Sequence, residues 1–265
     1  MLVGKIVALV NQKGGVGKTT TSINLAASLG VLGVKVLLVD LDPQGNASTG
    51  VGVDKGIIDK SIYDALIGEV DIKDVVLKTN FKNLYLIPAT INLAGVDIEL
   101  LEKSRNTNNF NKAEQLKVRL DQIKDNFDYL IIDCPPSLGI LTTNALTASD
   151  SVIIPVQCEF FALEGIMQLL NTIMLAQRRL NPNLDIEGVL LTMLDSRTNL
   201  GLEVVEDIRS YFKEKVYNTI IPRLIRLSEA PSHGKPIIAY DFNSKGNQAY
   251  LNLAKEVLIR NGKQA

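Results

Sequence analysis

The feature that most constrains this sequence is a glycine-rich segment that joins an apolar run to an amphipathic stretch. The run is Ile6–Val10, the segment is Asn11–Thr20, and the amphipathic stretch continues to Leu29. Small residues allow the backbone to direct its N–H groups inward, and the helix N-terminus that follows adds a partial positive charge. Such a strand-to-helix junction binds phosphate groups. The segment therefore predicts a phosphate loop.

Two side chains of this loop have defined chemical tasks. Lys18 reaches the β- and γ-phosphates of a nucleotide, and the Thr19 hydroxyl holds Mg²⁺. The common pattern G-x-x-x-x-G-K-[ST] is not met in full, because Gln12 replaces its first glycine and Lys13 adds a second lysine. A glycine-rich turn without a ligand is the alternative, but the glycine spacing, the Lys-Thr pair and the position before a helix favour a nucleotide. The predicted nucleotide-binding residues of the loop are Lys13, Gly14, Gly15, Val16, Gly17, Lys18, Thr19 and Thr20.

Short β-branched runs alternate with longer amphipathic stretches along the chain. Most of the runs are apolar throughout, as in strands buried on both faces of a parallel sheet. The alternation predicts an α/β fold of the P-loop NTPase class, with one mostly parallel, twisted sheet and helices on both faces. We expect a single domain over residues 1–265. The expected strands are Val3–Val10, Val34–Val39, Leu84–Ile87, Tyr129–Ile132, Val152–Val156 and Gly188–Met193, and the expected helices are Thr20–Leu29, Ile91–Ser104, Lys112–Lys124, Leu163–Leu180, Leu202–Lys215 and Ala249–Arg260.

Carboxylates stand where two of the expected strands end. Asp40 and Asp42 follow the run Val36–Val39, and Asp133 follows Tyr129–Ile132. The carboxyl ends of parallel strands face the ligand crevice of an open sheet. There Asp133 can hold the Mg²⁺ shell, and Asp40 can support Mg²⁺ through water. A helix cap or a turn carboxylate is the alternative role for Asp40 and Asp42.

The loop Lys13–Thr19 resembles the deviant Walker A motif of the ParA/MinD group of P-loop ATPases. The block Thr219–Pro236 resembles the chromosomal ParA (Soj) branch of that group, and the resemblance extends from Lys5 to about Leu258. It implies that Lys13 crosses a dimer interface and touches the partner's nucleotide. A cation supplied there stabilises the charge that develops on the transferred phosphoryl group.

The resemblance also implies roles for residues outside the loop. Asp42 would orient the attacking water, and the segment Cys134–Gly139 resembles the switch II segment of the family. The implied catalytic residues are Lys13, Lys18 and Asp42. The implied adenine site is formed by Met193, Pro222 and Leu224. The implied metal ligands are Thr19 and Asp133, with Asp40 as a further candidate.

The partners follow from the same resemblance. ATP with Mg²⁺ would join two copies of the chain in a sandwich dimer, and the dimer would bind double-stranded DNA of any sequence. A centromere-binding protein of the ParB/Spo0J type would stimulate hydrolysis and so release the dimer. This predicts a chromosome or plasmid partitioning ATPase that is cytoplasmic and associated with the nucleoid. The alternative is a MinD-like regulator of division that acts on a membrane.

A basic block provides a candidate surface for DNA. Residues 215–245 contain five basic residues and two acidic ones, in a chain whose net charge is −1. Few aromatic residues interleave with these charges, so we expect salt-sensitive contacts to phosphates rather than base stacking. An ordinary solvated face is the alternative. The predicted DNA-binding residues are Arg197, Arg223, Arg226, Lys235 and Lys245.

Other function classes find less support in the sequence. MinD-type proteins add a basic membrane-binding helix after the fold, whereas the stretch Ala249–Arg260 is expected to pack on the sheet, so no stable membrane association is predicted. Cys134 and Cys158 show no pairing pattern, which argues against a disulfide scaffold and favours a reducing cytoplasm. They do not match the cluster-binding pattern of the nitrogenase iron protein, and with the single His233 they cannot form a usual zinc site. We expect neither a targeting segment nor an N-terminal helix-turn-helix domain, because the first strand begins at about residue 3.

Overall fold

A computed structural model describes residues 4–108, 110–159 and 162–262. Seven strands in these residues form one sheet in the order β3-β4-β2-β5-β1-β6-β7. Every pair is parallel except the antiparallel pair of β3 with β4. The strands are β1 (Lys5–Leu9), β2 (Val36–Asp40), β3 (Leu77–Lys78), β4 (Leu84–Ile87), β5 (Tyr129–Asp133), β6 (Ser151–Gln157) and β7 (Asp185–Thr192).

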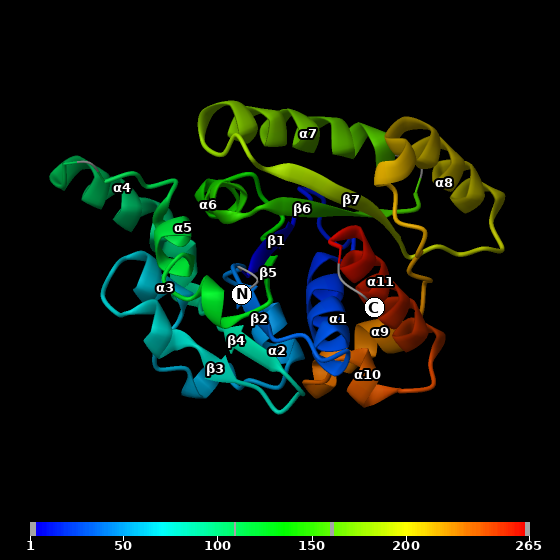
Figure 1. Ribbon diagram of the computed structural model, residues 1–265, viewed down its shortest axis with the longest axis horizontal. Helices are drawn as coiled ribbons and strands as arrows, with labels where there is room; N and C mark the ends of the chain where they lie inside the picture. Colours follow the sequence, from blue (N-terminus) through cyan, green and yellow to red (C-terminus); the bar gives the residue numbers. More distant parts are fainter. Residues whose placement is uncertain (1–3, 109, 160–161, 263–265) are drawn as a thin grey trace.

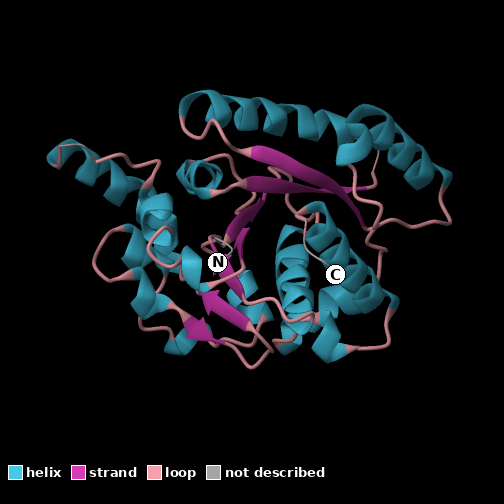
Figure 2. Cartoon of the chain, in the orientation of Figure 1, coloured by secondary structure: helices cyan, strands magenta, loops and turns pink. Residues whose placement is uncertain are grey.

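Helices cover both faces of this sheet (Figures 1 and 2). One apolar core contains Ile173 of α7 and Ile208 of α8, and the other contains Ile23 of α1 and Leu253 of α11. Figure 1 shows α1 beside α11 on one face and α7 along the other. The predicted α/β fold is therefore confirmed. The helices are α1 (Lys18–Val31), α2 (Asn46–Gly50), α3 (Ile62–Leu66), α4 (Val96–Asn106), α5 (Gln115–Leu120), α6 (Ile140–Ala148), α7 (Ala162–Arg179), α8 (Asn199–Phe212), α9 (Ile225–Glu229), α10 (Ile237–Tyr240) and α11 (Lys245–Arg260).

The central strands explain why the sequence shows apolar runs rather than alternation. Every residue of β2 and β5 is buried, because helices pack on both faces there. All six expected strands are present, although Val3 lies outside the described residues. The two-residue strand β3 was not predicted, because so short an antiparallel edge pair has no periodic signal.

The helix predictions differ from the structure mainly in length and number. The expected helix Ile91–Ser104 begins as a 3₁₀ turn over Ile91–Gly95, and only then continues as α4. Thr198 caps α8 by accepting a hydrogen bond from the N–H of Gly201, so this helix begins before the expected Leu202. The expected packing of the last helix is confirmed. Its buried apolar side chains are Tyr250, Leu253, Ala254, Val257 and Leu258.

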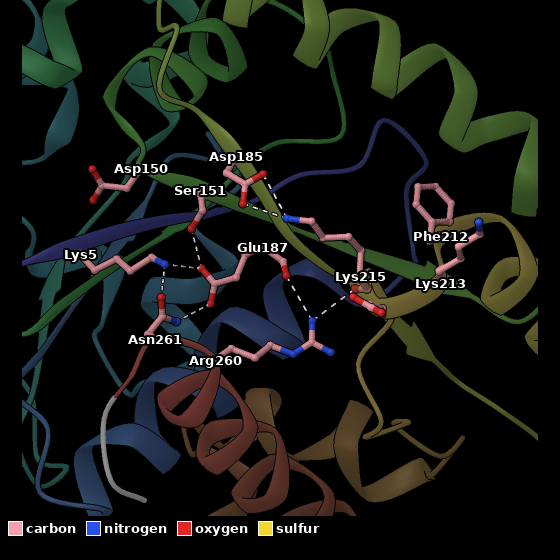
Figure 3. Close-up of a pocket in the computed structure, with 11 residues that line it drawn as sticks. Lys5, Asp150, Ser151, Asp185, Glu187, Phe212, Lys213, Lys215, Arg260 and Asn261 are labelled. Carbon is pink, nitrogen blue, oxygen red and sulfur yellow. Dashed lines mark hydrogen bonds and ion pairs between the residues drawn. The ribbon is translucent and has the colours of Figure 1, made fainter.

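A cleft of about 690 Å³ lies at the amino end of β7, where a buried carboxylate ties α11 to the sheet (Figure 3). Glu187 accepts hydrogen bonds from Ser151 and from Asn261 at 2.8 Å, and it pairs with Lys5 at 3.2 Å. Arg260 donates to the Glu187 carbonyl at 3.2 Å. These groups satisfy one another, and the cleft is remote from the carboxyl ends of the strands. We therefore interpret it as a structural junction.

Candidate nucleotide-binding site

The glycine-rich loop connects β1 to α1 at the carboxyl edge of the sheet. Gly15 has a φ of +77° and Gly17 a φ of +88°, a conformation that side chains with a Cβ rarely adopt. Gly17 precedes α1 without any side-chain cap, so the first N–H groups of the helix remain available to an anion. Val16 has a different role from its neighbours: its side chain is buried, and its carbonyl accepts a hydrogen bond from Thr192 Oγ1 at 2.8 Å. The end of β7 thus holds the loop in its curved shape.

Lys18 is held at the mouth of the loop. Its side chain is buried, and Nζ donates to the Lys13 carbonyl at 3.1 Å. Burial lowers the pKa of this ammonium, while the carboxylates of Asp133 and Asp42 oppose the shift. Lys18 lines the same cleft as the loop glycines, where its ammonium can pair with a phosphate group.

Asp133 is the last residue of β5, and it contacts α1, the helix that follows the loop. Ser22 Oγ donates to Asp133 Oδ1 at 2.9 Å, whereas Oδ2 is buried without a hydrogen-bond partner among the described residues. Burial raises the pKa of Asp133 to about 7, and the nearby charge of Asp40 adds to the shift, whereas the hydroxyls of Thr19 and Ser22 oppose it. A buried carboxylate oxygen left unsatisfied in this way fits the shell of a Mg²⁺ ion. The residues present therefore suit Mg²⁺ held by Thr19 and Asp133.

Asp40 is occupied by the protein itself. Its Oδ2 accepts hydrogen bonds from the N–H and the hydroxyl of Ser48, both at 2.7 Å, and its Oδ1 accepts one from the N–H of Asp42 at 3.2 Å. Burial raises the pKa of this carboxyl to about 6. Ser48 in turn accepts a hydrogen bond from the N–H of Ala89 at 3.2 Å. Asp40 thus links β2 to α2 and to the segment after β4, which favours a structural role over the expected support of Mg²⁺.

Asp42 and the loop line a cleft of about 310 Å³. Asp42 is buried, and its Oδ1 accepts a hydrogen bond from the N–H of Gln44 at 2.9 Å, which fixes the carboxylate toward the loop residues. A second cleft of about 150 Å³ adjoins the first and shares Gly17, Thr20 and Met193 with it. The first cleft has the size and the donors for phosphates, and the second combines apolar side chains with polar ones, Arg223 among them. Its lining includes the predicted adenine residues Met193, Pro222 and Leu224, together with Leu227 and Tyr250.

Comparisons with known proteins agree with this geometry. A family model described as an AAA domain matches residues 4–186. The chain is 59% identical to the sporulation initiation inhibitor protein Soj of Bacillus subtilis, covering 96% of this chain and 98% of that protein. It is 49% identical to the chromosome-partitioning ATPase Soj of Treponema pallidum, covering 98% of this chain and all of that protein.

The chain belongs to the ParA/Soj family of partition ATPases.

A solved structure shares the fold of this ParA/Soj chain. It is cobyrinic acid a,c-diamide synthase from Mycobacterium smegmatis with a bound ATP analogue and magnesium, with a TM-score of 0.85, 38% identity, and coverage of 98% of this chain and 96% of that one. That neighbour therefore holds an ATP analogue and magnesium in a fold that this chain shares.

Two residues of the ParA/Soj site were not predicted from the sequence. Tyr250 lines the smaller cleft, and its hydroxyl lies 3.2 Å from Thr21 Oγ1 of α1. Thr192 lines the same cleft and anchors the loop. Tyr250 belongs to an apolar helical stripe, which predicts packing but not ligand binding. Thr192 lies in no recognisable motif, so the sequence provided no signal for a role in the site.

Lys13 lines neither of the two clefts. Its side chain is exposed, and Nζ lies 3.3 Å from Glu159 Oε2 in the segment after β6. An ion pair between two exposed side chains contributes little to stability. Lys13 is therefore free to exchange this contact for another anion.

The basic residues predicted to bind DNA fall into two groups. Arg223, Lys235 and Lys245 are exposed and form no ion pair within the part of the chain that the structure describes. Arg197 pairs with Asp195 at 2.6 Å, and Arg226 pairs with Asp241 at 2.5 Å. Lys215, which contributed to the charge count of the block, instead lies at the amino end of β7 and pairs with Asp185. Three of the five predicted residues are thus unpaired, whereas Arg197 and Arg226 would have to exchange a surface ion pair for a phosphate contact.

Proposed function

We propose that this chain is a Mg²⁺-dependent ATPase that segregates DNA by binding it in the ATP state and releasing it after hydrolysis. The observation that carries the proposal is the joined pair of clefts, with the loop, Lys18 and Asp42 around one and Met193, Pro222 and Leu224 beside the other. The similarity to partition proteins along almost the entire chain supports the same function.

The residues of the larger cleft divide the chemistry of hydrolysis among them. The N–H groups of the loop and Lys18 bind the phosphates and stabilise the charge that develops on them. When Mg²⁺ is bound, Thr19 and Asp133 hold it, and it neutralises phosphate charge. Asp42 orients the attacking water, because its carboxylate is fixed by the N–H of Gln44 and lies on the same cleft as Lys18.

Two copies of the chain form a sandwich across this edge in the ATP state, with Lys13 of each copy contacting the partner's nucleotide. The exposure of Lys13 and its surface ion pair with Glu159 support this role. A dimer doubles the number of unpaired cations contributed by Arg223, Lys235 and Lys245, and so strengthens sequence-independent binding to DNA. A ParB-type protein acts as the stimulating partner, and the ATPase works in the cytoplasm on the nucleoid.

The structure provides no support for the membrane-bound and the iron–sulfur alternatives. Within the described residues, no helix has the length and the hydropathy that crossing a bilayer requires. The apolar face of α11 is packed against α1 and the sheet. Cys134 and Cys158 are both buried, so neither thiol is placed to share a cluster between subunits.

Binding to a random-sequence DNA duplex tests the proposal. The full chain is measured without nucleotide, with ADP, and with a slowly hydrolysed ATP analogue, each with Mg²⁺ over a range of salt concentrations. We expect tight binding only with the ATP analogue, and weaker binding at high salt. Lys18→Ala serves as the control that removes nucleotide binding and hence DNA binding. Equal binding in all three nucleotide states, or none in any state, contradicts the proposed function.

A further inference from the structure

Two exposed apolar side chains stand close to unpaired cations in the sequence. We call Arg223, Lys235 and Lys245 the basic surface. Ile225, the first residue of α9, is 78% exposed and follows Arg223 by two residues, while Phe242 is 66% exposed and precedes Lys245 by three. Scattered single apolar residues are normal on a surface, but two large ones next to unpaired cations point to a ligand that is both anionic and partly apolar.

Both side chains are presented by rigidly connected segments. Arg226, next to Ile225, pairs with Asp241, next to Phe242, at 2.5 Å. The start of α11 packs so closely on α9 that a Cβ at Gly246 would lie 3.0 Å from Leu227 Cδ2. Because both contacts join the same two segments, Ile225 and Phe242 are held on one platform.

The backbone beside Phe242 is fixed as well. Asn247, in the first turn of α11, is buried, and its Nδ2 donates to the Phe242 carbonyl at 2.7 Å. The exposed ring is therefore attached to an anchored main chain. Little backbone entropy remains to be lost when this ring contacts a ligand.

We propose that Ile225 and Phe242 make apolar contacts with the sugar walls of double-stranded DNA while the basic surface contacts the phosphates. This inference rests on the proposed DNA-binding function and assigns two further residues to it. The deoxyribose sugars lie between the phosphates along each strand and present C–H surface at the edges of the grooves, so an apolar side chain can contact them without reading a base. Such contacts carry no sequence preference, so they suit a protein that binds any duplex.

A membrane is the other anionic and apolar ligand, but the local structure favours DNA. Interfacial membrane binding requires a helix with a broad apolar face. The helix α9 spans only Ile225–Glu229, and its Leu227 is buried in the core. Two side chains on a compact platform provide too little apolar area for a stable membrane anchor.

The test separates the apolar contribution from the electrostatic one. The full chain with Mg²⁺ and the ATP analogue is titrated with a random duplex over a range of salt concentrations. We expect Phe242→Ala and Ile225→Ala each to weaken binding about five- to tenfold at every salt concentration, with the salt slope unchanged. Phe242→Leu should retain most of the affinity, because it remains apolar. Arg223→Ala should instead reduce the slope.

Ile259→Ala provides the matched control. Ile259 is 64% exposed and lies on the same helix as Lys245, about 20 Å away along its axis. The Ile259→Ala variant should bind DNA with the affinity of the parent chain. All variants should unfold at the same temperature as the parent.

Three results would overturn the inference. One is unchanged DNA affinity in both alanine variants, with the parent binding normally. Another is a weaker affinity with a reduced salt slope, which would indicate a disturbed basic surface instead. The third requires a separate measurement with vesicles that contain anionic lipid. The inference fails if the parent binds these vesicles and the two alanine variants lose that binding while they keep their affinity for DNA. If the parent itself binds DNA in no nucleotide state, the proposed function fails, and this inference fails with it.

Discussion

Replacement of Asp133 by Asn should make the nucleotide-free protein more stable, by an amount that grows with pH. In the folded chain burial raises the pKa of this carboxyl from 3.8 to about 7. The folded state therefore binds an extra proton between about pH 4 and pH 7, and the stability of the parent falls as the pH rises through that interval. Asn has no proton to lose, so the variant lacks this dependence.

The size of the effect follows from the shift. At about 1.4 kcal/mol per pKa unit, the ionised carboxylate costs on the order of 3–4 kcal/mol of unfolding free energy at pH 7. The stability difference between Asp133→Asn and the parent should then increase by about 2 kcal/mol from pH 5 to pH 7. The amide nitrogen of Asn adds a cost for an unsatisfied buried donor, but that cost is the same at every pH.

Urea unfolding at pH 5, 6 and 7, with a chelator present and no nucleotide, measures this difference. The control is Asp195→Asn. Arg197 lowers the pKa of the half-buried Asp195 to about 2, so the stabilising contribution of this carboxylate is complete above pH 4 and is lost only as the pH falls through about 2. Its difference from the parent should stay constant from pH 5 to pH 7. If the difference in unfolding free energy between Asp133→Asn and the parent is also constant from pH 5 to pH 7, the argument that the ionised Asp133 destabilises the folded chain is refuted.

Three further predictions concern catalysis, DNA and the fold. Asp42→Ala should keep ATP binding and dimer formation but lower hydrolysis on the order of a hundredfold or more, as measured by phosphate release and by sedimentation; near-normal turnover would contradict its role. Arg223→Ala combined with Lys245→Ala removes four cations from the dimer, so it should weaken binding to all duplexes alike and reduce the salt slope by about four; an unchanged slope would indicate a solvated face. Glu187→Ala should lower the unfolding free energy by about 2–4 kcal/mol, because Lys5 loses its buried partner. Unfolding in urea measures this loss. A loss below about 0.5 kcal/mol would contradict the structural role of Glu187.

The sequence alone determined the sheet and most of the phosphate site. Strands buried on both faces, such as Tyr129–Asp133, appear in the sequence as short, continuous apolar runs. Such runs predict parallel strands without reference to the rest of the chain. The glycines and Lys18 belong to one continuous segment, so their arrangement follows from local backbone geometry. Asp42 and Asp133 could be placed near the loop because the carboxyl ends of parallel strands share one edge.

The tertiary structure alone decided which polar groups are already satisfied and which remain available. Asp40 and Asp133 look alike in the sequence, yet Ser48 occupies one carboxylate while an oxygen of the other stays unsatisfied. Arg223 and Arg226 are near neighbours, but of these two only Arg226 forms an ion pair with a described residue, because Asp241 approaches from another segment. Tyr250 joins the smaller cleft because α11 packs against α1. Each of these outcomes depends on contacts between residues distant in the sequence, and no local pattern encodes such contacts.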